Sequence, residues 1–385
     1  MSTEIYAPGL EGVVAGETAI STVEGGLCYR GYPITELAEK TTYEEVAYML
    51  LHGELPRPAE LEAFRQRLER HRQLPDALLR FFRALPPDTP MMDVLRTSVS
   101  LLTHFDPDYH RWPKEPTAPA ALALVQDLLS KISERLLAQM AAAIAAYFRI
   151  SRGLEPLAPK SGLSHAAQFL YQLTGEVPDD PAVRAFDVSL ILYAEHEFNA
   201  STFTARVITS TLSDPYSAIV GALGALKGPL HGGANEHVMP FLRRIATPER
   251  VEEHLQAMLA RKERVMGFGH RVYKTGDLRA TILSTWAARL AQSRGETQWE
   301  VIAQRVEEYL RTTKNLHPNL DWPAGRLYYY LGLPISLYTP IFAASRVAGW
   351  CAHIREQWQA NRLIRPRARY IGPPLRLVPP LQERV

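Results

Sequence analysis

Three short stretches place ionisable side chains beside glycine or proline, where core packing would not favour them. KGPLHGGANEHV carries His231, MGFGHRVYKTGDLR carries His270, and HPNLDWPAGR carries Asp321. Glycine next to a histidine permits unusual backbone angles and lets a ligand approach the main chain. Two imidazoles and a carboxylate can perform acid–base chemistry near neutral pH, because imidazole titrates there and burial raises the pKa of a carboxyl group. The combination is typical of a proton-transfer site.

Each of these residues also has a purely structural interpretation. A glycine-flanked histidine can serve in a turn, and Asp321 taken alone is better explained as the cap of the helix that follows it. Metal binding by His231 and His237 is disfavoured, because a separation of six residues is neither the i, i+4 pair of a helix nor a known zinc spacing. Spacing alone therefore leaves the function open.

A fourth stretch, TPIFAASRVAGWCAHIREQW, predicts an apolar helix that contains an arginine. Thr339 would cap this helix with Pro340 at its first position, and Phe342 and Arg346 then lie four residues apart on one face. A buried guanidinium is costly unless an anion or a salt bridge to another helix satisfies it. Together with this residue, the chain has enough arginines to hold a small polycarboxylate: Arg279, Arg346, Arg365, Arg367 and Arg369.

The elements that must position these residues are mostly helical. The first forty residues are rich in Gly, Val and Thr and predict short hairpins, whereas apolar residues at helical spacing dominate beyond Glu36. In GALGALKG, glycines three and four residues apart would let another helix approach closely. Three of the predicted helical faces are Val251, Leu255, Met258 and Leu259 after a Thr247–Pro248 start; Ile282, Trp286 and Leu290 before a stop at Gly295; and Val301, Ile302, Val306 and Leu310. The predicted class is all-α.

Composition narrows the class of protein. The 385 residues are 46% hydrophobic and 22% charged with a net charge of +2, which gives no general reason to expect nucleic acid or a membrane as partner. Two cysteines and the lack of a signal-like N-terminus favour a cytoplasmic location. The longest uncharged run, between Arg326 and Arg346, contains glycine and two prolines and therefore predicts two buried helices around a turn.

Six motifs resemble those of the citrate synthase family and occur in the order and spacing of that family. The N-terminal GLEGVVAGETAIS also resembles the opening of its shorter bacterial and archaeal forms, so the resemblance covers nearly the whole chain. The six motifs are HEFNASTFTAR, GPLHGGANE, GFGHRVYKTGDLR, NLDWPAG, IFAASRVAGW and RPRARYIG.

This resemblance implies a multi-helical fold in which a large and a small domain close over substrate. Residues 1–228 and 327–385 would form the large domain, and residues 229–326 would form the small mobile domain. The C-terminal tail would reach between the subunits of a homodimer whose active sites are shared.

The resemblance also implies the site residues. The catalytic trio would be His231, His270 and Asp321. Oxaloacetate would be bound by His196, Arg279, Phe342, Arg346 and, from the partner subunit, Arg365. Coenzyme A would lie against Val272, Tyr273, Lys274 and Asn319. Neither a metal nor a cofactor is expected, because the coenzyme A thioester is a substrate.

The implied mechanism assigns one role to each member of the trio. Asp321 would remove a proton from the thioester methyl group. His231 would donate to the thioester oxygen from a neutral imidazole, with a backbone N–H on its other ring nitrogen fixing the tautomer. His270 would polarise the ketone of oxaloacetate. Two departures from many relatives stand close to this machinery: Glu195 where aspartate is common, and Trp322 after the catalytic aspartate.

The implied function is condensation of acetyl-CoA with oxaloacetate to citrate, at the entry to the tricarboxylic acid cycle. The nearest alternative is the same chemistry with propionyl-CoA, giving 2-methylcitrate, because one methylene in a pocket supplies only about 1–3 kcal/mol of discrimination. Alternatives of other classes are an inactive helical dimer that binds metabolites and a helical metal-dependent hydrolase.

Overall fold

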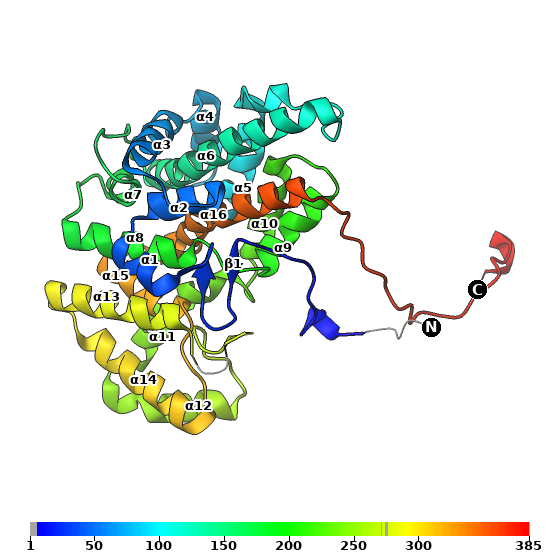
Figure 1. Ribbon diagram of the computed structural model, residues 1–385. Coiled ribbons are helices and arrows are strands. Elements are labelled where there is room, and N and C mark those ends of the chain that lie inside the picture. Colours follow the sequence, from blue (N-terminus) through cyan, green and yellow to red (C-terminus); the bar gives the residue numbers. More distant parts are fainter. Residues whose placement is uncertain (1–5, 271, 274–275, 385) are drawn as a thin grey trace.

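The computed structural model describes residues 6–270, 272–273 and 276–384. Figure 1 shows helices throughout the body and one small sheet, so the predicted mostly helical class with N-terminal hairpins is confirmed. The sheet contains β1 (Ser21–Thr22), β2 (Cys28–Tyr29) and β3 (Tyr32–Pro33), which pair antiparallel in that order.

Most of the chain lies in sixteen α-helices of the described residues. Their bounds are α1 Ile34–Lys40, α2 Tyr43–His52, α3 Pro58–His71, α4 Asp76–Ala84, α5 Met91–Leu102, α6 Pro119–Ile150, α7 His165–Thr174, α8 Asp180–Tyr193, α9 Ala200–Ser210, α10 Pro215–Leu226, α11 Val238–Ile245, α12 Val251–Ala260, α13 Leu278–Arg294, α14 Gln298–Lys314, α15 Asp321–Tyr330 and α16 Tyr338–Gln359.

Helix α16 runs through the main hydrophobic core. Every residue from 338 to 354 is buried, as expected for a helix surrounded by others on all sides. It packs against α2, α6, α8, α9 and α10. Its neighbour α10 contacts α9 closely at Gly221, where a Cβ atom would lie 2.2 Å from Cδ1 of Ile208. Gly221 therefore allows the close helix approach that was predicted, whereas a Cβ atom at Gly224 would meet no atom within 4 Å.

A second, smaller hydrophobic core joins α11, α12, α14 and the start of α15. Its buried members run from Val238 to Trp322, and Figure 1 shows α12 and α14 below the main group of helices. Helix α13 lies in the same stretch of sequence but packs on α8 and α15, and its Leu283 and Ala287 belong to the main core. The proposed limits of the small domain, 229–326, stay a prediction.

The predicted helical faces correspond to α12, α13 and α14 with local differences. Helix α13 ends at Arg294, and Gly295 after it takes a left-handed φ of +70°, so the predicted stop is confirmed. Pro248 begins a short 3₁₀ turn, and α12 follows it from Val251. Of the four residues predicted for α14, Ile302, Val306 and Leu310 are buried, whereas Val301 is 42% exposed.

The uncharged run between Arg326 and Arg346 is divided as expected. Helix α15 ends at Tyr330, Gly332 takes a left-handed φ of +72°, and α16 follows. The predicted cap of α16 was wrong, because the helix already begins at Tyr338 and the hydroxyl of Thr339 contacts Glu236 instead. No helix of the described residues is long and apolar enough to cross a membrane.

Candidate active site

Residues from five distant parts of the chain meet around two buried guanidinium groups. Arg346 lies close enough to His196, His231 and Asp321 to shift the pKa of all three, and Arg279 does the same for His196 and Asp321. The ring centroids of His196 and His270 are 5.1 Å apart. We call this group the central cluster: His196, His231, His270, Arg279, Asp321 and Arg346.

His231 precedes the 3₁₀ turn η4 (Gly232–His237), and its ring is oriented by the first turn of α9. The backbone N–H of Ser201 donates to Nε2 of His231 at 3.3 Å, and the Ser201 hydroxyl lies 2.8 Å from the same nitrogen. Burial and the nearby Arg346 lower the pKa of His231 to about 4. The imidazole is therefore neutral at pH 7, and acceptance at Nε2 leaves Nδ1 to carry the hydrogen.

His270 is oriented in a comparable way by its own loop. The backbone N–H groups of Val272 and Tyr273 both point at Nδ1 of His270, at 3.0 and 3.3 Å. Because Nδ1 accepts, Nε2 is the ring nitrogen that can donate. The ring stacks on Tyr273 with centroids 4.6 Å apart. These contacts hold the His270 donor in one direction.

Asp321 is the first residue of α15 and is buried beside a tyrosine that sequence reasoning missed. The hydroxyl of Tyr193 donates to Oδ1 of Asp321 at 2.6 Å. Burial raises the pKa of Asp321 to about 6, although Tyr193 and Arg279 act to lower it. The simple helix-cap interpretation was wrong, since Asn319 accepts the N–H of Asp321 and leaves its carboxyl group to the cluster.

Arg346 has hydrogen-bonding capacity left over. Its Nε donates to the carbonyl oxygen of Tyr193 at 2.6 Å, and its guanidinium lies 4.6 Å from the ring centroid of Phe342, as the predicted shared face requires. Its Nη1 is buried without a hydrogen-bond partner. Burial lowers the pKa of Arg346 to about 10. The guanidinium therefore remains charged at pH 7. A salt bridge that satisfies all of its donors, the structural alternative, is contradicted by the unpaired Nη1.

Arg279 is held more firmly. Asp277 accepts from its Nε at 3.0 Å and from its Nη2 at 2.8 Å. The same carboxylate also accepts the backbone N–H of Arg279, at the start of α13. Bidentate pairing of this kind orients a guanidinium as well as balancing its charge.

Asn319, predicted to contact coenzyme A, joins the loop of His270 to the helix of Asp321. Its backbone N–H donates to the carbonyl of Gly267 at 2.9 Å, and its Nδ2 donates to the carbonyl of Gly269 at 3.0 Å. Its Oδ1 also receives the N–H of Asp321 at 3.1 Å. These bonds join the His270 loop to the start of α15, and the contact of Asn319 with coenzyme A stays a prediction.

The other residues predicted to contact coenzyme A lie on the His270 loop. The N–H groups of Val272 and Tyr273 are used by His270, so among their backbone polar groups only the carbonyls stay available for a ligand. Lys274 lies outside the described residues. A cavity of about 180 Å³ opens beside this loop, lined by Gly269, His270, Tyr273, Gly276, Asp277, Asn315, Leu316, His317 and Pro318.

Arg365 is not part of the central cluster of its own chain. It is exposed on the segment that follows α16, and Figure 1 shows this segment extending away from the helices. Its predicted entry into the site of a partner subunit stays a prediction.

Helix α15 lies unusually close to the His231 turn, and this proximity depends on Gly325. A Cβ atom at this position would lie 2.7 Å from Cβ of Val238 and 2.9 Å from the carbonyl oxygen of Asn235. Gly325→Ala should therefore lower the free energy of unfolding by about 1–3 kcal/mol, as overpacked cores do. Urea unfolding measures this change, and an unaltered midpoint would contradict the close packing described above.

Comparison with known proteins adds the family context. The family model described as "Citrate synthase, C-terminal domain" matches residues 9–367. Citrate synthase 2 of Bacillus subtilis is 44% identical over 378 residues, covering 98% of this chain and 98% of its own. The 2-methylcitrate synthase of Mycobacterium tuberculosis H37Rv is 46% identical over 374 residues, covering 96% of this chain and 92% of its own.

A solved structure with bound ligands is also similar. It is the ternary complex of carboxymethyl coenzyme A and oxaloacetate with citrate synthase from Thermoplasma acidophilum. It has a TM-score of 0.90 and 34% sequence identity, covering 99% of this chain and 100% of the other.

Proposed function

The chain belongs to the citrate synthase family of condensing acyltransferases, and from this premise we propose that it joins acetyl-CoA to oxaloacetate and hydrolyses the product thioester to citrate and coenzyme A. The observation that carries the proposal is the central cluster itself. It combines a buried carboxyl group of raised pKa, two imidazoles with oriented donors, and two guanidinium groups suited to a dicarboxylate. The same combination is what enolisation and condensation require.

The proton-transfer step begins at Asp321. A thioester methyl group is a weak carbon acid, so its base must be ionised at working pH and must lie in a dry environment. A carboxyl group with a pKa of about 6 is a stronger base than an ordinary aspartate and is still mostly ionised at pH 7. Nδ1 of His231 then donates to the enolate oxygen as negative charge develops there.

Oxaloacetate, the electrophile, is oriented by the arginines of the central cluster together with His196 and His270. Arg346 and Arg279 bind the two carboxylates of oxaloacetate with help from His196 and Phe342, which fixes the ketone relative to the enolate. Nε2 of His270 donates to the ketone oxygen and gives it a proton as the carbon–carbon bond forms. Closure of the small domain excludes water, because an exposed enolate would be reprotonated before it condensed.

A homodimer with shared sites is part of the proposal. The C-terminal segment exposes a series of large apolar side chains, with Ile371 92%, Leu375 100% and Leu377 93% exposed. Exposure on this scale marks a contact surface, and a second copy covering it would let Arg365 enter the neighbouring oxaloacetate site. Both cysteines are unpaired thiols, which suits the proposed cytoplasmic location.

The second candidate is 2-methylcitrate synthesis from propionyl-CoA. It is favoured by the Mycobacterium tuberculosis relative, which is 46% identical over 374 residues. Initial rates of thiol release, measured for both acyl-CoAs at saturating oxaloacetate, decide between the two substrates. We expect a higher kcat/KM for acetyl-CoA, and a reversed ratio would favour 2-methylcitrate.

Two controls in the same assay address the other classes of protein. Thiol release must depend on oxaloacetate, since release without it would indicate simple hydrolysis. No thiol from either acyl-CoA would favour an inactive metabolite-binding dimer. Loss of activity in the presence of a chelator would support a metal-dependent hydrolase. In the described part of the chain, no group of three His, Cys, Asp or Glu side chains is arranged to hold a metal ion.

Tyr193→Phe should move the acidic limb of the kcat/KM profile to higher pH. The Tyr193 hydroxyl stabilises the ionised form of Asp321, so its removal raises the pKa of the base above about 6. For an upward shift of one unit, activity at pH 6 relative to activity at pH 8 should fall about fivefold. Initial rates between pH 5 and 9 measure this effect.

Tyr328→Phe is the matched control for this experiment. Tyr328 is also fully buried and near Asp321, but its hydroxyl lies 3.4 Å from Ser189. The pH profile of kcat/KM for Tyr328→Phe should keep the acidic limb of the wild-type protein. Equal shifts in both variants would mean that general packing, and not the hydrogen bond to Asp321, governs the ionisation.

A further inference from the structure

We propose that Ser21, on the N-terminal strand β1, is a positioning residue for His196 and thereby for oxaloacetate. This inference rests on the proposed function, because it assigns His196 to the substrate site. Strand β1 lies far from the catalytic motifs in sequence. The hydroxyl group of Ser21 nevertheless bonds to both residues that flank His196, and we call the segment 195–197 the His196 bend.

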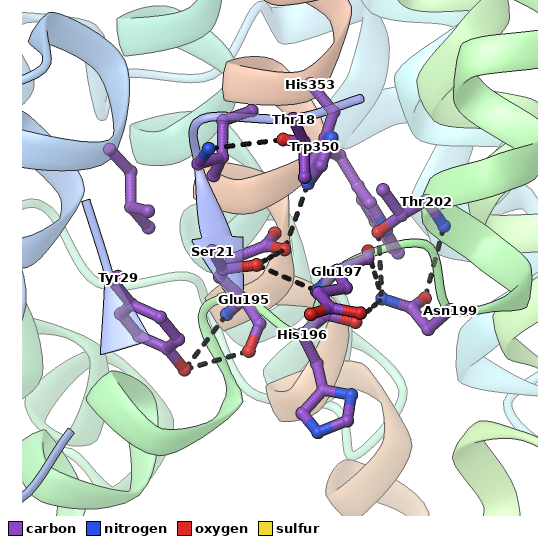
Figure 2. Close-up of polar contacts among 12 residues, drawn as sticks. Thr18, Ser21, Tyr29, Glu195, His196, Glu197, Asn199, Thr202, Trp350 and His353 are labelled. Carbon is purple, nitrogen blue, oxygen red and sulfur yellow. Dashed lines mark hydrogen bonds and ion pairs between the residues drawn. The ribbon is translucent and has the colours of Figure 1, made fainter. Parts of the chain in front are cut away.

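The Ser21 hydroxyl makes two hydrogen bonds in opposite senses. It donates to Oε1 of Glu195 at 2.9 Å and accepts the backbone N–H of Glu197 at 3.0 Å. Ser21 is 7% exposed, so water has little access to replace either bond. Figure 2 shows these contacts on one side of the bend, with the imidazole of His196 directed away from them.

The bend itself has a backbone conformation that needs support. Glu197 has a φ of +47°, in the left-handed region that side chains with a Cβ atom disfavour. Its carboxylate accepts the N–H of Val23, just beyond β1, at 2.6 Å. The N-terminal hairpin therefore holds Glu197 by its main chain and by its side chain.

Glu195 provides the other fixed end of the bend. The side chains of Glu195 and His353 are fully buried, and Nε2 of His353 lies 2.9 Å from Oε1 of Glu195. Arg206 donates to Nδ1 of His353 at 2.9 Å, so Nε2 is the nitrogen that carries the hydrogen and donates to Glu195. The hydroxyl of Tyr29, on β2, donates to the backbone carbonyl of Glu195 at 2.8 Å.

Close packing leaves Glu195 little room to move. A Cβ atom at Gly349, on α16, would lie 2.3 Å from Oε2 of Glu195 and 2.3 Å from the carbonyl oxygen of Ala194. Helix and carboxylate thus meet only because residue 349 is glycine. Without the Ser21 hydroxyl, the segment would stay anchored at Glu195, but the backbone N–H of Glu197 would lose its bond, and the side-chain contact with Val23 would remain to hold that residue.

The consequence reaches the substrate through His196. Its Nε2 lies 2.9 Å from the hydroxyl of Tyr273, and its ring lies 5.1 Å from that of His270. Small movements of the bend change the direction of the His196 imidazole. A misdirected imidazole would bind oxaloacetate more weakly, because hydrogen bonds depend on orientation. The expected defect is specific to oxaloacetate, because Ser21 bonds neither to the His231 turn nor to the start of α15.

The test compares Ser21→Ala with Thr22→Ala. Thr22 is the neighbouring residue of β1, and within the described part of the chain its exposed hydroxyl accepts only the local N–H of Glu24. Calorimetric titration of each folded variant with oxaloacetate alone measures binding without turnover. Ser21→Ala should raise the Kd and the KM for oxaloacetate about tenfold, which corresponds to about 1.4 kcal/mol. The KM for acyl-CoA and the kcat should stay within about twofold, and Thr22→Ala should match wild type.

The outcomes separate this inference from the proposed function. If wild-type protein binds no oxaloacetate, the proposed function fails. If wild type binds but Ser21→Ala binds equally well, or if it loses affinity for oxaloacetate and acyl-CoA alike, the positioning role is wrong. Should Ser21→Ala not fold, Ser21→Cys replaces the hydroxyl oxygen that makes both bonds while keeping a side chain of similar size, and the same selective rise in Kd is required.

Discussion

Asp321→Asn should lower kcat by about a thousandfold, within the range expected for loss of a general base. The amide keeps the shape of the side chain and can still accept from Tyr193, but it cannot take a proton from carbon. Oxaloacetate binding depends on the arginines, so its Kd should change less than about threefold. Steady-state kinetics with acetyl-CoA and separate titration with oxaloacetate measure the two quantities.

Glu307→Gln is the matched control for Asp321→Asn. Glu307 is another carboxyl group whose pKa is raised by burial, and it accepts from the indole of Trp322, the residue after Asp321. Its replacement should leave kcat within a few-fold of wild type. Near-normal turnover of Asp321→Asn, or an equal loss in Glu307→Gln, would remove Asp321 from the role of base.

The pH dependence gives the same assignment a second check. The base must be ionised, and the pKa of Asp321 is about 6, so kcat/KM should fall as the pH drops through 6. In Asp321→Asn, the residual activity should lack this limb. A limb that persists unchanged in the variant would belong to another group.

Arg346→Ala should weaken oxaloacetate binding by at least about thirtyfold, corresponding to the 2 kcal/mol or more lost when a buried charge partner is truncated. Its Nη1 is buried without a hydrogen-bond partner, and its charge lies near His196, His231 and Asp321. An anionic substrate would satisfy this donor. Titration with oxaloacetate measures the loss directly, before any effect on turnover.

Arg355→Ala separates substrate binding from helix packing. Arg355 lies nine residues further along α16 and donates to the backbone carbonyl of Leu51, much as Arg346 donates to that of Tyr193. This control should lower thermal stability without changing oxaloacetate affinity. If Arg346→Ala behaves in the same way, with a normal Kd and a lower melting temperature, its guanidinium is structural.

Three members of the central cluster stand out in the sequence because they violate a local rule of packing, whereas His196 was implied only by the family resemblance. His231 and His270 stand beside glycines, and Arg346 lies in a mostly apolar stretch of its helix. Such violations are visible residue by residue. The fold brings these side chains together around Arg279 and Arg346.

Tyr193 could not be predicted in the same way. It lies in a helix whose last turns are buried, where an aromatic residue satisfies every local preference. Its functional contact is with Asp321, 128 residues away. The only available signal was a tyrosine hydroxyl that burial would leave in need of a partner.

The sequence by itself determined the helical class, the end of α13 before Gly295 and the presence of a charged group within α16, because periodicity and backbone preference act over a few residues. Only the tertiary structure decided which N–H groups orient the two imidazoles, which hydroxyl faces Asp321, and that strand β1 supports the bend at His196. The bonds of Ser21 to that bend join residues 174 and 176 positions apart. No short-range pattern specifies such a pair, because its geometry is set by how the whole chain packs.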